Sequence, residues 1–142
     1  MESKIFPGTV ESIDLIRQYI KEISAHAGLD KKATYNLMLA ADEIATNIML
    51  YGYEKAGLTG DLKVLHTITE EELVVIFEDQ ALPFDPLARE LPDEEDLSKP
   101  LEERSIGGLG IFLTVSGIDD FSYEYVNNQN RNIFKMKLQK PD

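Results

Sequence analysis

The sequence contains no cysteine and only two histidines, His26 and His66. Without cysteine the chain can form neither a disulfide nor a thiolate metal site, and the redox compartment is left open. The two histidines are far apart in the sequence and have no ligand pattern near them. This arrangement argues against a zinc site.

Long apolar runs are also missing. No segment approaches the roughly 18–20 apolar residues that are needed to cross a bilayer. The first ten residues, MESKIFPGTV, lack the charged-then-apolar layout of a signal peptide. We therefore expect a cytoplasmic protein that does not bind membranes.

Positive charge is scarce, because 14 basic side chains face 26 acidic ones and the formal net charge is −12. Such a field repels nucleic-acid phosphates and anionic membranes, so direct nucleic-acid binding is not expected. A phosphorylated ligand stays compatible with this charge, since local backbone N–H groups outweigh a distant mean field.

Apolar residues recur with helical spacing in the first third of the chain. They predict one amphipathic helix that ends at Gly28 and a second that runs from Asp30 to about Gly52. The expected buried positions are Ile13, Ile16, Ile20 and Ile23 in the first helix, and Leu37, Ala41, Ile44 and Ile48 in the second.

Strand-like patterns follow the two helices. Residues 62–68 and 73–79 predict one hairpin, and the turn-like sequence NNQNR, at 127–131, predicts another near the end of the chain. The 142 residues suffice for a single domain with its own core. The expected fold class is α+β, a two-layer sandwich with helices packed on one face of a mostly antiparallel sheet.

A polar, acidic stretch at about 86–106 interrupts the periodic pattern and carries Pro86, Pro92 and Pro100. It is long for a connection within a compact domain, so it is either a functional lid or a disordered segment. The apolar run from Ile111 favours a buried helix, although its β-branched residues would also suit a strand.

The second predicted helix carries the first candidate site. Glu43 and Asn47 are four residues apart and therefore lie on the same helix face, beside the apolar stripe. A carboxylate there could accept a proton from a hydroxyl, and the amide oxygen could join a magnesium shell. Taken alone, the pair also reads as a solvated glutamate and an asparagine near a helix end.

Two further candidates lie at a strand end and in a glycine-rich turn. Asp79 ends an apolar strand, where it could accept from the amino group of a purine or merely cap the chain reversal. Residues 106–110, IGGLG, have glycines that allow close backbone approach before a plausible helix N-terminus. The lysine and Ser/Thr of a Walker motif are absent, and a plain hinge would have the same composition.

The order and spacing of these three features resemble the histidine-kinase-like (GHKL) ATP-binding domain, also known as the Bergerat fold. Within that group the chain is most similar to the small anti-sigma factor serine/threonine kinases. EIATNIMLYGY resembles their N-box, EDQALPFDP their first glycine box and GGLGIFL their second. The resemblance extends from about Val10 to Leu138.

The resemblance implies an ATP-dependent protein serine/threonine kinase that uses Mg²⁺ and also acts as an anti-sigma factor. It assigns Glu43 as the general base for a protein hydroxyl, Asn47 as a magnesium ligand and Asp79 to the adenine amino group. The other implied cofactor contacts are Ala81, Phe84, Arg104, Gly107, Gly108, Leu109 and Gly110. The implied partners are a STAS-type anti-anti-sigma substrate, a sigma factor and a second copy of the chain.

One departure from the family pattern concerns Ala81, which stands where the pattern Asp-X-Gly-X-Pro-Phe-Asp-Pro has glycine. If that position requires a positive φ, alanine would add about 1–2 kcal/mol of strain, and close approach to the base would also suffer. ATP affinity would then fall roughly ten- to thirtyfold. The alternative function is therefore a partner-switching regulator without catalysis, which either binds nucleotide or does not need it.

Overall fold

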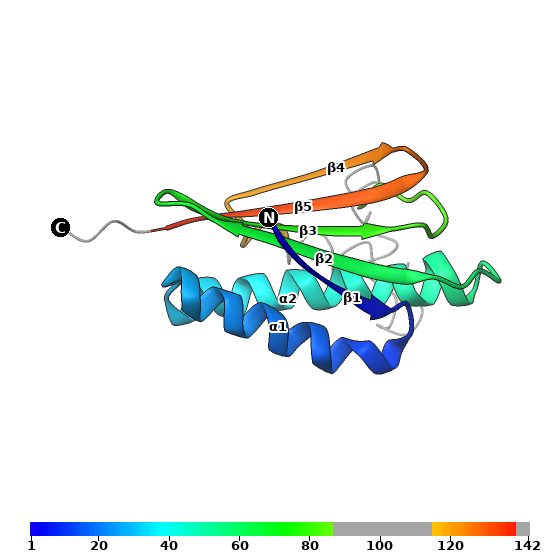
Figure 1. The fold of residues 1–142 in the computed structure, drawn as a ribbon, viewed down its shortest axis with the longest axis horizontal. Helices are drawn as coiled ribbons and strands as arrows, with labels where there is room; N and C mark the ends of the chain where they lie inside the picture. Colours follow the sequence, from blue (N-terminus) through cyan, green and yellow to red (C-terminus); the bar gives the residue numbers. More distant parts are fainter. Residues whose placement is uncertain (87–114, 139–142) are drawn as a thin grey trace, which may run out of the picture.

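The structure is a computed structural model that describes residues 1–86 and 115–138. Over these residues a five-stranded antiparallel sheet, in the order β1-β2-β3-β5-β4, is covered on one face by helices α1 and α2 (Figure 1). The predicted two-layer α+β fold is confirmed. The strands are β1 (Glu2–Pro7), β2 (Asp61–Ile68), β3 (Glu72–Asp79), β4 (Asp120–Val126) and β5 (Gln129–Lys137). The helical elements are η1 (Val10–Ser12), α1 (Ile13–Ala27), α2 (Lys31–Asn47) and η2 (Ile48–Glu54).

The helix boundaries follow local chemistry that the sequence displays. Gly28 ends α1 in the left-handed conformation, with a φ of 79° that glycine adopts without a Cβ clash. Asp30 caps α2, because its side chain accepts a hydrogen bond from the backbone N–H of Ala33 at 2.7 Å. Both predicted boundaries are confirmed.

The far end of α2 differs from the prediction, because the chain does not fray at Gly52. It continues as the π-helix η2, in which the N–H of Lys55 bonds to the carbonyl of Leu50 at 2.8 Å. The wider π turn occurs often at functional sites. Here it brings Gly52 and Tyr53 beside the end of β3, where the N–H of Gln80 donates to the Tyr53 hydroxyl at 3.0 Å.

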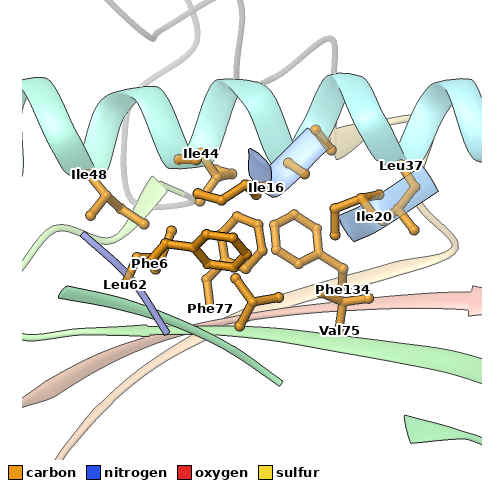
Figure 2. Close-up of a cluster of buried hydrophobic side chains, with 14 of the residues drawn as sticks. Phe6, Ile16, Ile20, Leu37, Ile44, Ile48, Leu62, Val75, Phe77 and Phe134 are labelled. Carbon is orange, nitrogen blue, oxygen red and sulfur yellow. The ribbon is translucent and has the colours of Figure 1, made fainter. Parts of the chain in front are cut away.

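The core lies between the helices and the inner face of the sheet, where side chains from both layers point toward one another (Figure 2). Phe77 and Phe134, from adjacent strands, meet edge to face with ring centroids 5.0 Å apart. The predicted helical stripes are buried, except that Ile13 is only partly covered. Within the described parts of the chain, no helix is both long and apolar enough to span a membrane.

The second hairpin has a tighter turn than the sequence indicated. β4 ends at Val126 and β5 begins at Gln129, so only Asn127 and Asn128 form the turn, with φ values of 54° and 63°. Two successive positive φ values are what a two-residue hairpin loop requires, and asparagine tolerates them. The remaining residues of NNQNR are strand, and this places Asn130 on the helix-facing side of β5.

Candidate functional site

A cavity of about 470 Å³ lies between the C-terminal part of the helix α2–η2 and the ends of β3 and β5. This volume is within the range of small-molecule sites. Four predicted cofactor contacts, Asn47, Asp79, Ala81 and Phe84, line it together. The other lining residues are Ile44, Ile48, Tyr51, Gly52, Leu82, Pro83, Pro86, Asn130 and Asn132.

Asp79 is a buried carboxylate whose two oxygens have different surroundings. Oδ1 accepts from the backbone N–H of Ala81 and from Nδ2 of Asn130, each at 2.9 Å. Oδ2 is buried and has no hydrogen-bond partner among the described residues. Burial raises the pKa of Asp79, while the two hydrogen bonds oppose that rise. Asp79 thus lines the cavity and has one carboxylate oxygen without a partner among the described residues, and an acceptor of this kind is what the exocyclic amino group of adenine requires.

Glu43 and Asn47 meet on one face of α2, as their spacing predicted. Nδ2 of Asn47 donates to the backbone carbonyl of Glu43 at 2.9 Å and to its Oε1 at 3.4 Å. These contacts use the amide nitrogen, and among the described residues no hydrogen bond to the amide oxygen of Asn47 occurs. Asn47 lines the cavity, whereas Glu43, one turn earlier in α2, is half-buried and is not among the lining residues. An amide oxygen and a carboxylate are hard donors of the kind that Mg²⁺ prefers.

Residues 6–138 match the family described as "Histidine kinase-like ATPase domain". The chain belongs to this family. Among its relatives, the serine-protein kinase RsbW of Listeria monocytogenes serovar 1/2a is 30% identical over 120 residues, which is 84% of this chain and 76% of that protein. RsbW of Halalkalibacterium halodurans is 29% identical over 108 residues, covering 75% and 65% of the two chains. RsbW of Bacillus cereus strain AH187 is 26% identical over 121 residues, covering 84% and 74%.

Membership confirms the predicted family resemblance and implies that this histidine kinase-like ATPase domain uses ATP. The remaining predicted contacts, Arg104, Gly107, Gly108, Leu109 and Gly110, lie outside the described residues, as does nearly all of the predicted lid. The described part of the domain therefore contains the predicted adenine contacts Asp79, Ala81 and Phe84 and the predicted N-box residues Glu43 and Asn47.

Two residues of the cavity, Asn130 and Asn132, were missed by sequence reasoning, which read the first of them as part of a turn. Both are buried on the inner face of β5. Asn130 contacts Asp79, and Oδ1 of Asn132 has no partner among the described residues. The signal was the alternation NRNIFKMK, in which Asn130 and Asn132 share a period of two with the core residue Phe134.

Ala81, the departure from the family pattern, does not carry the backbone strain that we considered. Among described non-glycine residues only Asn127 and Asn128 have a positive φ. The methyl group of Ala81 is instead buried against Gly52 of η2, where a Cβ added to the glycine would lie 2.7 Å from it. The N–H of Leu82 also donates to the carbonyl of Gly52 at 3.1 Å. The absence of a side chain at position 52 makes room for the alanine.

Replacing Gly52 by alanine should therefore destabilise the protein by about 2 kcal/mol, because two Cβ atoms would overlap in a packed site. At an open helical position the same change would stabilise by about 0.5–1 kcal/mol, so the sign is diagnostic. Adding Ala81→Gly should restore the free energy of unfolding, measured by chemical denaturation. Equal losses in the single and double variants would show that the two residues do not compensate each other.

Proposed function

We propose that this protein is an ATP-dependent serine/threonine kinase that phosphorylates a STAS-type anti-anti-sigma protein and sequesters a sigma factor. The observation that carries the proposal is that Asp79 and Asn47 line one cavity, and that the buried Oδ2 of Asp79 has no partner among the described residues. The kinship with serine-protein kinases supports the kinase activity. Homodimerisation is part of the proposal on the same family grounds.

In this proposal the described residues share the work of binding and proton transfer. Asp79 Oδ2 accepts a hydrogen bond from the adenine amino group and thereby fixes the base. The amide oxygen of Asn47 would hold Mg²⁺, which when bound neutralises charge on the phosphates. Glu43 accepts the proton of the substrate hydroxyl. In the same step the hydroxyl oxygen bonds to the γ-phosphorus, and the bond between that phosphorus and the bridging oxygen of ADP breaks. Phosphoryl transfer needs mainly this kind of positioning.

The experiment that tests the proposal is incubation of the full chain with Mg-ATP and a cognate STAS protein. Phosphoserine or phosphothreonine on the STAS protein is the expected product, detected by mass spectrometry. ATP binding without any transfer would contradict the kinase assignment and leave the non-catalytic regulator.

Calorimetry with ATP and ADP, on the wild type and on Ala81→Gly, separates the two functions further. The non-catalytic alternative rests on Ala81 and on the acidic stretch at about 86–106, and the fit of the Ala81 methyl group against Gly52 weakens the first of these grounds. We expect the wild type to bind both nucleotides and Ala81→Gly to bind them with similar affinity. Absence of binding by the wild type together with strong binding by the variant would favour the non-catalytic regulator.

A further inference from the structure

Asn130 makes hydrogen bonds to the adenine-facing aspartate and to the wall of the cavity at the same time. Its Nδ2 donates to Asp79 Oδ1 at 2.9 Å, to the carbonyl of Ala81 at 3.1 Å and, more weakly, to the carbonyl of Leu82 at 3.4 Å. The side chain is buried, with 3% of its surface exposed. One amide nitrogen thus joins the end of β3 to the loop that follows it.

The other end of the same amide is also fixed. Oδ1 of Asn130 accepts from the Tyr123 hydroxyl of β4 and from the backbone N–H of Phe84 at 3.3 Å. The hydroxyl can donate and the Phe84 N–H can only donate, so these contacts define which end of the amide is oxygen. With Oδ1 held in this way, Nδ2 faces Asp79 and the carbonyls of Ala81 and Leu82 in the loop that follows β3.

The consequence for Asp79 is that one oxygen is used and the other is not. Oδ1 accepts two hydrogen bonds from the protein, and Oδ2 accepts none from the described residues. A carboxylate held by one oxygen cannot rotate without breaking those bonds. The free oxygen is therefore oriented before any ligand arrives, and preorganisation of this kind lowers the cost of binding.

We propose that Asn130 is a positioning residue for nucleotide binding, which holds the Asp79 carboxylate and the 81–84 segment in the geometry that receives the base. The inference rests on the proposed function, since it takes Asp79 as the acceptor for adenine. Tyr123 acts one step further away, because it holds Asn130.

A merely structural role for Asn130 predicts a loss of stability and nothing else, whereas positioning predicts a change in the titration of Asp79. The hydrogen bond from Asn130 stabilises the charged form and opposes the rise in the pKa of Asp79 that burial causes. The titratable groups close to Asp79 are Tyr53 of η2 and Tyr123 of β4. Burial raises the pKa of both tyrosines, so they remain neutral in the acidic range and do not obscure the change.

The test compares Asn130→Ala and Tyr123→Phe with the wild type, by calorimetry with ATP over the acidic to neutral range. Asn130→Ala should bind ATP about tenfold more weakly, as expected for one lost hydrogen bond to a charged group. As the pH is lowered, the ATP affinity of Asn130→Ala should begin to fall at a higher pH than the affinity of the wild type. Tyr123→Phe keeps the amide and should show a smaller change in the same direction. Gln129→Ala, on the opposite face of β5, is the control and should match the wild type.

Carboxyl NMR of Asp79 without nucleotide makes the result independent of the proposed function. If the wild type does not bind ATP, the proposed function fails, and a higher pKa of Asp79 in Asn130→Ala would still support the positioning role. Unchanged ATP affinity and an unchanged Asp79 titration in both variants would overturn it. Should Asn130→Ala fail to fold, Tyr123→Phe alone decides, because it leaves the buried amide in place.

Discussion

Replacing Glu43 by glutamine is expected to slow phosphoryl transfer by about 10²- to 10⁴-fold while leaving ATP binding close to that of the wild type. General base catalysis contributes about 10²- to 10⁴-fold to such reactions, and glutamine cannot accept the proton. Glutamine keeps the Oε1 acceptor that faces Nδ2 of Asn47 at 3.4 Å, so the N-box helix should stay intact. Single-turnover transfer from Mg-ATP to the STAS protein measures the loss, and calorimetry measures the affinity.

Asp42 provides a matched control for this experiment, because it is the acid next to Glu43 in the sequence. Its carboxylate forms an ion pair with Arg17 of α1 at 2.8 Å and is not among the residues that line the cavity. Asp42→Asn should therefore transfer phosphate at the wild-type rate. Wild-type transfer by Glu43→Gln would contradict its role as the base, and loss of ATP affinity would assign it to binding instead.

Much of the fold was predictable because its signals are local or periodic. Apolar residues at helical spacing predicted both helices. Gly28 marked the end of α1 because it adopts a positive φ, and Asp30 marked the start of α2 because its side chain caps the first turn. Glu43 and Asn47 could be placed together for the same reason, since helix geometry fixes their separation. The hairpin of β2 and β3 followed from two strand patterns and a short polar connection.

The features that escaped prediction depend on contacts between distant parts of the chain. Asn130 looks like a turn residue by composition, and it joins the cavity only because β5 pairs with β3, placing it opposite Asp79. The fit of Ala81 could not be judged from its own neighbours either. It depends on Gly52, which is 29 positions earlier and comes close only through the π-helical end of α2.

Replacing Asp79 by asparagine is expected to weaken ATP binding by at least about 100-fold, because a site built to accept a hydrogen bond would present a donor instead. The existing donors, Ala81 N–H and Asn130 Nδ2, hold the oxygen of the new amide at the place of Oδ1. The amide nitrogen must then take the place of Oδ2 and face the amino group of adenine. Inosine triphosphate has a carbonyl at that position, so the variant should discriminate far less in favour of ATP than the wild type. Calorimetry with both nucleotides measures the two preferences.

The same substitution should preserve the fold, and its pH dependence shows whether binding or stability has changed. Burial raises the pKa of Asp79 in the folded state above its unfolded value, so the folded protein holds that proton more tightly. This contribution to the free energy of unfolding is complete below the unfolded pKa and is lost as the pH rises through the folded pKa. Without the carboxyl group, Asp79→Asn should lose less stability than the wild type as the pH is raised from acid to neutral, in thermal unfolding. A variant that unfolds at neutral pH would contradict the expected preservation of the fold, and one that still prefers ATP as strongly as the wild type would remove Asp79 from the adenine site.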